Sequence, residues 1–266
     1  MVIYKGTLDD KNVAIATFEE HESKMIELCL TEISLATVSY HHNFIRVYGY
    51  CLETYVPMLV YQLFPWSLDV HGRLHGDMVL QKPMKWNDRL RVATDIGYAL
   101  SYMHNAFSKP VVIRDIVSSS IIIDTPFCAK LTNFAHSVSV TPGQKDLQLP
   151  VHGAPGYIDP EYIETQEVTE KCDVYNFGVL MLELLTARDP VEMARRGKDL
   201  VDEFVSAVKT NGGMEIIDKH VLEEDNMDEI LWFVRLALTC VANIGVARPT
   251  MTEVVDELWV IQDQDK

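Results

Sequence analysis

The chain has 266 residues, of which 48% are hydrophobic, and this length and composition suit one large domain or two lobes that share a cleft. The formal net charge is −16, from 23 basic and 39 acidic residues. This balance argues against binding to nucleic acid, which rewards clusters of Lys and Arg, and against binding to anionic membrane surfaces. The acidic excess fits either a solubilising surface or an acidic face for a basic partner.

Cysteine spacing and hydropathy limit the class of protein further. The five cysteines lie far apart, at Cys29, Cys51, Cys128, Cys172 and Cys240. They predict neither a disulfide framework nor a zinc site, and they favour a reducing compartment. The chain has no signal-peptide pattern at its start and no apolar run of about 18 residues, so we expect a cytosolic protein without a transmembrane helix. The pair His41-His42 has no partners at ligand spacing, and we expect no metal site.

The first third of the chain has the pattern of strands. Residues 1–4 and 12–18 alternate in a period of two around a turn at 8–11, which predicts a hairpin. Apolar residues recur among acids over 20–38, as on an amphipathic helix. Two more strands are predicted over 44–52 and 57–61.

The remainder of the chain has mainly helical patterns. We predict helices over 86–106, 173–186, 231–241 and 252–262. Trp232 and Phe233 are adjacent on one of these helices, so one of them is expected to face outward. Strands first and helices afterwards indicate the α+β class.

The segment VVIRDIVSSSIIID, which follows the first of the long predicted helices, has the frame of a protein-kinase catalytic loop. In that loop the usual order is His-Arg-Asp, then Lys, then Asn, before an apolar strand. Here Ile113 stands at the His position, Val117 at the Lys position and Ser120 at the Asn position. Only Arg114 and Asp115 remain.

Further matches extend this similarity over nearly the whole chain. They are Tyr4-Lys5-Gly6, Val13-Ala14-Ile15-Ala16, Leu59-Val60-Tyr61-Gln62, the segment from Gly153 to Tyr162, the segment from Asp173 to Val179, and the segment from Ala247 to Met251. The chain resembles the protein-kinase fold, specifically the plant receptor-like and receptor-like cytoplasmic kinases. The resemblance implies a bilobal α+β domain. Residues 1–64 would form a truncated small β lobe without the glycine-rich loop, and residues 65–266 would form a helical large lobe.

The resemblance also implies that the catalytic site is degenerate. Phosphoryl transfer relies on a lysine at the phosphates, metal ions held by acids, and an aspartate that receives the hydroxyl proton. Ala16 stands at the lysine position, so Glu32, at the αC glutamate position, has no ion-pair partner. Asn133 replaces the main magnesium carboxylate, and Ser120 offers only a hydroxyl to a second metal. We therefore expect a pseudokinase that binds no magnesium and shows no metal-dependent affinity for ATP.

A lysine from another strand could in principle reach the phosphates. Lys5 is two residues from Ile3 and lies on the same face of its predicted strand. We favour a solvated lysine, because its ammonium group is flexible and strongly hydrated. Asp115 alone does not make a kinase.

Other positions are implied to keep a structural role. Asp173 would brace the catalytic loop that contains Arg114, and Glu161 would form a buried ion pair with Arg248. A vestigial adenine pocket would be formed by Ala14, Tyr61, Gln62 and Ile122. For Ala14 and Ile122 we favour core filling without a nucleotide.

Within the plant kinases, the chain most resembles the ZED-related pseudokinase group of plant immunity, which shares much of its pattern with the wall-associated kinase-like group. The residues that carry this are Val47 to Glu53, Val56 to Tyr61, Leu74 to Trp86 and Gly156 to Pro160. The resemblance implies a cytoplasmic adaptor or decoy, at the inner plasma-membrane face when its partners are there. It would bridge the leucine-rich-repeat side of a coiled-coil NLR receptor and an active receptor-like cytoplasmic kinase. Two alternatives stay open: a weakly active or nucleotide-binding serine/threonine receptor-like kinase, and a decaying paralogue without a partner.

Overall fold

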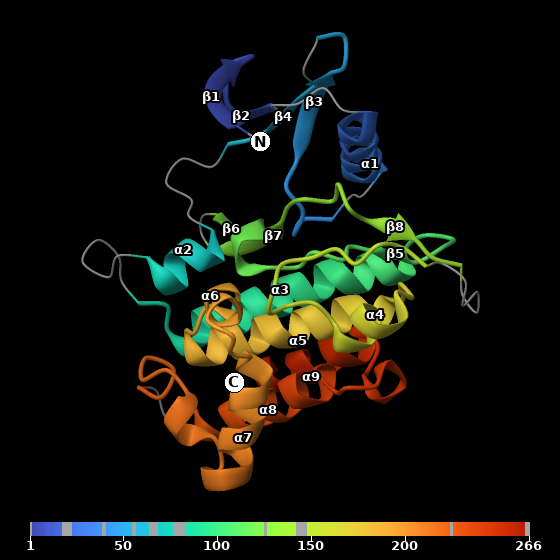
Figure 1. Ribbon diagram of the computed structural model, residues 1–266. Coiled ribbons are helices and arrows are strands. Elements are labelled where there is room, and N and C mark those ends of the chain that lie inside the picture. The colour runs from blue at the N-terminus through green and yellow to red at the C-terminus, as the bar shows by residue number, and fades with distance from the viewer. Residues whose placement is uncertain are drawn as a thin grey trace.

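The structure is a computed structural model, and it describes residues 2–17, 23–38, 41–54, 57–63, 69–76, 83–124, 127–141, 148–223 and 226–263. A small lobe built on a β-sheet stands on a larger helical lobe (Figure 1). The predicted α+β class and the order of strands before helices are confirmed. The predicted boundary between residues 64 and 65 lies outside the described residues and stays a prediction.

The small lobe contains a four-stranded antiparallel sheet. Its strands are β1 (Val2–Leu8), β2 (Lys11–Thr17), β3 (Val47–Cys51) and β4 (Met58–Gln62), in the order β1-β2-β4-β3. Asp9 and Asp10 join the first two strands with positive φ angles of 47° and 62°, as a tight hairpin turn requires. The predicted hairpin is confirmed, although its outer ends, Met1 and Phe18, lie outside the described residues.

One helix, α1 (Ser23–Val38), lies beside this sheet and contacts β3 (Figure 1). Ile33 of α1 packs with Ala16 of β2 and Leu59 of β4 in a small separate core. The sequence pattern predicted this helix from residue 20, and residues 20–22 lie outside the described residues.

The large lobe is mainly helical. Its helices are α2 (Val70–His75), α3 (Trp86–Asn105), α4 (Pro160–Thr165), α5 (Glu170–Thr186), α6 (Pro190–Arg195), α7 (Leu200–Asn211), α8 (Met227–Cys240) and α9 (Met251–Asp263). Short strands pair as β5 (Val111–Val112) with β8 (Val138–Ser139), and as β6 (Ile121–Asp124) with β7 (Cys128–Leu131). The four predicted helices are confirmed as α3, α5, α8 and α9. No helix in the described ranges is both long and apolar enough to span a membrane.

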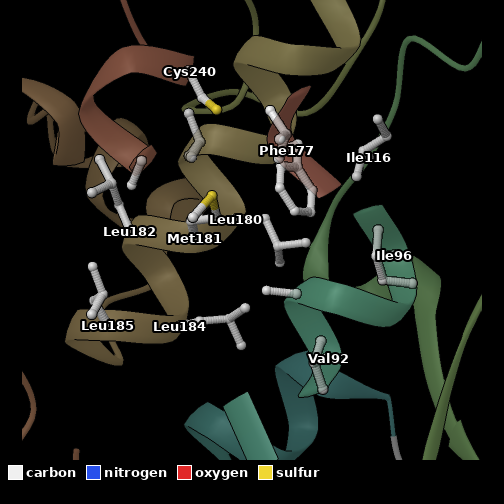
Figure 2. Packing of buried hydrophobic residues seen from close by; sticks show 14 of the residues in the cluster. Val92, Ile96, Ile116, Phe177, Leu180, Met181, Leu182, Leu184, Leu185 and Cys240 are labelled. Atoms are coloured by element: carbon white, nitrogen blue, oxygen red, sulfur yellow. The ribbon is translucent and has the colours of Figure 1, made fainter. Parts of the chain in front are cut away.

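The core of the large lobe is organised around α5, which is buried on all sides. Figure 2 shows Phe177 and Leu184 of α5 among the buried side chains, together with Val92 and Ile96 of α3. A helix that is apolar all round needs neighbours on every face, and α3, α7 and α8 contact it. Gly178 permits the approach of α8, because a Cβ there would lie 2.7 Å from the Cβ of Cys240.

Candidate active site

A buried carboxylate hydrogen-bonds to the backbone of the loop that carries Asp115. Asp173, in the first turn of α5, accepts hydrogen bonds from the backbone nitrogens of Ile113 (2.8 Å) and Arg114 (2.9 Å). Its Oδ2 also lies 2.9 Å from Nε2 of His104 on α3. Arg114 has a positive φ of 71°, and these bonds hold it in that conformation. Asp173 therefore lies where the predicted brace of the loop would be.

Asp115 is surrounded by hydrogen-bond donors of the protein itself. Its Oδ1 accepts the backbone N–H of Ala154 (3.2 Å), and the side-chain nitrogen of Asn133 lies 3.4 Å from its Oδ2. Nε2 of His152 lies 3.9 Å from the same oxygen. Burial raises the pKa of Asp115, while the charge of His136 and the bond from Ala154 act in the opposite direction.

Glu32 is the buried acid of α1, and it meets hydrogen-bond donors rather than a cation. It accepts a hydrogen bond from the hydroxyl of Tyr61 (3.1 Å) and a short one from the backbone nitrogen of Phe134. No lysine or arginine pairs with it among the described residues. Burial raises its pKa to about 7, against the effect of these hydrogen bonds. Ala16, at the predicted lysine position, is buried on β2 opposite Leu59.

The remaining degenerate positions are packed into the protein. Val117 belongs to the large hydrophobic core, and Ser120 is buried while its carbonyl accepts the backbone N–H of Thr132 (2.9 Å). Asn133 has a positive φ of 69°, and the next residue, Phe134, packs edge-on against Phe44 with ring centroids 5.1 Å apart.

The predicted adenine positions divide between the lobes. Ala14 of β2 pairs with Tyr61 of β4, and Gln62 follows on the same strand. Ile122 lies in β6 of the large lobe, where it is bridged to Asp69 at the N-cap of α2. All four side chains are half-buried. The structure brings three of these residues together on neighbouring strands.

Lys5 and the histidine pair show no catalytic or metal-binding arrangement. Lys5 is exposed on β1, opposite Ala14, and forms no ion pair within the described ranges. His41 and His42 stack with ring centroids 4.8 Å apart, and burial lowers the pKa of His41 to about 4. Over the part of the chain that the structure describes, no cluster of three or more His, Cys, Asp or Glu residues could hold a metal ion.

The prediction that Glu161 is the buried partner of Arg248 needs correction. The guanidinium binds both oxygens of Asp159, with Nη1–Oδ2 at 2.5 Å and Nη2–Oδ1 at 2.7 Å. Glu161 lies 4.0 Å from Nη2, at the limit of an ion pair, and its side chain is 39% exposed. The reason is geometric: Asp159 is the N-cap of α4 and faces inward, whereas Glu161 accepts the backbone N–H of Gly245 at 2.6 Å.

Arg114 ties the loop to the segment before α4. Its Nη2 donates to the carbonyl of Pro150 (2.7 Å) and lies 2.5 Å from the hydroxyl of Tyr162, and its Nη1 donates to the carbonyl of His136 (3.3 Å). All these partners belong to one stretch that leads away from Asn133. The guanidinium thus holds that stretch against the loop.

Sequence reasoning missed the structural role of another buried acid. Glu183 of α5 is fully buried, and it binds the hydroxyl of Ser118 (2.8 Å), Nε2 of His75 (2.8 Å) and, through a short bond, the hydroxyl of Tyr157. It therefore connects α2, the Asp115 loop and the segment before α4 to the central helix. The sequence feature that could have indicated this role is a single acidic residue inside the apolar run from 179 to 186.

We predict that Asp159→Asn destabilises the fold far more than Glu161→Gln. The first change leaves the buried Arg248 charge without its partner and should cost about 3–5 kcal/mol of unfolding free energy. The second keeps an acceptor for Gly245 and removes a half-exposed charge, which should cost less than about 1 kcal/mol. Urea denaturation of both variants checks this, and equal losses would contradict the assignment of Asp159.

We also predict that Glu32→Gln changes how stability depends on pH. Because the folded-state pKa of about 7 lies above the ordinary 4.5, the folded chain holds the proton more tightly, and the free energy of unfolding falls as pH rises between these values. The cost at high pH is on the order of 3 kcal/mol. Gln mimics the protonated acid, so the variant should match the wild type near pH 5 and exceed it near pH 8. A difference that stays constant with pH would contradict this cause.

Comparison with known proteins places this architecture in a family. Residues 2–258 match the family described as protein tyrosine and serine/threonine kinase. Wall-associated receptor kinase-like 5 of Arabidopsis thaliana is 39% identical over 259 residues, which is 96% of this chain and 35% of that protein. Wall-associated receptor kinase 3 of the same organism is 37% identical over 263 residues, which is 98% of this chain and 35% of that protein.

The chain therefore spans about a third of the length of these curated relatives. With the two lobes, the braced Asp115 loop and a match over nearly every residue, the chain belongs to the protein tyrosine and serine/threonine kinase family.

Proposed function

We propose that this kinase-family chain is a pseudokinase that acts as an adaptor or decoy in plant immune signalling. The observation that carries the loss of catalysis is the environment of Glu32. Its carboxylate accepts hydrogen bonds from the hydroxyl of Tyr61 and the backbone nitrogen of Phe134. Ala16 offers no ammonium group for a nucleotide phosphate. Phosphoryl transfer depends on such positioning and electrostatic contacts more than on covalent chemistry.

The substitution at Asn133 supports the same proposal. A carboxylate is the hard oxygen ligand that magnesium prefers, and a neutral amide supplies less charge. Each electrostatic contact removed from such a site costs on the order of 10²–10³ in rate. We infer that the chain uses neither magnesium nor ATP as a cofactor. Val117 supplies no charge to a phosphate, and Ser120 offers only a hydroxyl to a second metal.

The adaptor role rests on the scaffold that remains and on the resemblance to ZED-related pseudokinases. Asp173 still braces the loop, and Asp159 still pairs with Arg248. Its partners would be a coiled-coil NLR receptor and an active receptor-like cytoplasmic kinase, in the cytoplasm or at the inner face of the plasma membrane. Exposed aromatic side chains suit such a surface, and Trp232 of α8 and Trp259 of α9 are 40% and 55% exposed.

A weakly active serine/threonine receptor-like kinase is the second candidate. The observation that favours it is Asp115, which keeps the position of the catalytic base beside Ala154. The two Arabidopsis thaliana relatives reported above are named as receptor kinases. Under this alternative, phosphate transfer would be measurable and would disappear in Asp115→Asn.

We predict that magnesium adds nothing to the effect of ATP on thermal stability. A ligand present at ten times its dissociation constant stabilises a fold by about 1.4 kcal/mol, which raises the melting temperature of a domain of this size by several degrees. Differential scanning fluorimetry with ATP, with and without magnesium, should show no such rise. The kinase domain of wall-associated receptor kinase-like 5 serves as the positive control.

A magnesium-dependent rise in melting temperature would contradict the loss of the metal site. Radiolabelled phosphate transfer to a generic protein substrate is measured in parallel. Transfer that Asp115→Asn abolishes would replace the pseudokinase proposal with the second candidate.

We predict saturable binding of the chain to the leucine-rich-repeat domain of a coiled-coil NLR receptor. A quantitative pull-down should be unaffected by Asp115→Asn, because an adaptor needs no catalytic base. Trp232→Ser and Trp259→Ser, which change exposed side chains on α8 and α9, test whether these helices carry the interface. A well-folded sample that binds no such domain would count against the adaptor role and leave the kinase family intact.

A further inference from the structure

A cavity of about 220 Å³ lies where four parts of the large lobe meet. These are α2, the start of α3, the residue after α5 and the loop that precedes α8. The charged or titratable side chains that line it are Arg73, Arg89, Asp218, Lys219 and His220. Cations outnumber the single acid here, although the whole chain carries a net charge of −16.

Arg89 and Asp218 form a fixed and neutral wall of this cavity. Arg89 is 2% exposed, and its Nη2 makes a short ion pair with Asp218. Its other donors are also used, because Nε binds the carbonyl of Met84 (2.9 Å) and Nη1 binds that of Leu184 (2.7 Å). The positive charge that is not neutralised therefore comes from the other side chains.

Arg73 and His220, which both line this cavity, each contain a buried nitrogen without a hydrogen-bond partner. Nε of Arg73 is buried, and its guanidinium has neither an ion pair nor a hydrogen bond within the described ranges. Nε2 of His220 is likewise buried and has no partner there. Lys219 is exposed beside them, and no acid pairs with it in the described part of the chain. Buried polar groups are normally satisfied, so two such nitrogens at one cavity indicate a missing acceptor.

The missing acceptor is best matched by a small oxyanion. A guanidinium offers five donors in a fixed fork that fits the oxygens of a phosphate, and the lysine adds a point charge. The cavity is smaller than the roughly 300–1,000 Å³ of sites for drug-sized ligands, so it excludes a nucleotide or a folded peptide. We propose that this cavity binds a phosphate group, as inorganic phosphate or a small phosphomonoester.

The test uses isothermal titration calorimetry with sulfate as the first probe. Chloride keeps the ionic strength constant. We expect saturable binding of sulfate. Inorganic phosphate and glycerol phosphate are then titrated separately; tighter binding of the second identifies a phosphomonoester, and equal binding identifies free phosphate. Binding of none of the three anions would overturn the proposal.

Two matched variants locate the binding. Arg73→Met should weaken sulfate binding at least tenfold, whereas Arg235→Met, which removes the same charge from the exposed face of α8, should change it less than twofold. Circular dichroism and the urea midpoint of each variant confirm folding, which Arg73→Met should preserve because this arginine has no ion pair to lose. Equal losses in the two arginine variants would show a general charge effect and overturn the site.

Discussion

The buried carboxylate of Asp173 is the interaction on which the arrangement of the large lobe depends. It is anchored in α5, the helix around which the core packs, and it fixes the loop through the backbone nitrogens of Ile113 and Arg114. Any residue except proline supplies that N–H group at position 113. The hydrogen bonds from Asp173 therefore do not depend on the side chain at position 113. An apolar residue there, where kinases have a histidine, can leave the loop in the same conformation. Removing the partners of such a buried acid would cost several kcal/mol of unfolding free energy.

Glu32 shows how a buried acid can join the small lobe to the large lobe through hydrogen bonds. Hydrogen bonds from Tyr61 and the backbone of Phe134 connect α1, β4 and the segment after Asn133. Burial raises the pKa of Glu32 to about 7, so the acid is partly protonated at neutral pH and its uncompensated charge is reduced. A neutral acid can be held by dipoles alone. Hydrogen bonds to Glu32 thus connect the two lobes.

Long periodic segments could be predicted from the sequence, and pairings between segments could not. Hydrophobic periodicity within a single segment was enough to predict the hairpin and helices α3, α5, α8 and α9. Helix α7 (Leu200–Asn211) was not predicted, although its Asp199 N-cap was a local signal. The partner of Arg248 depended on which of two acids, Asp159 or Glu161, turns inward at the start of α4. That choice is set by the N-cap geometry, which residue types alone do not reveal.

Asn133 also determines which charge lies next to Asp115. Its amide nitrogen lies 3.4 Å from Oδ2 of Asp115, and an aspartate in its place would bring a second carboxylate to that oxygen. Two carboxylates so close repel each other unless a cation or a proton lies between them. The amide removes that requirement and supplies a donor instead. The half-buried Asp115 can then lie beside Ala154 without a metal, which is compatible with a structural role.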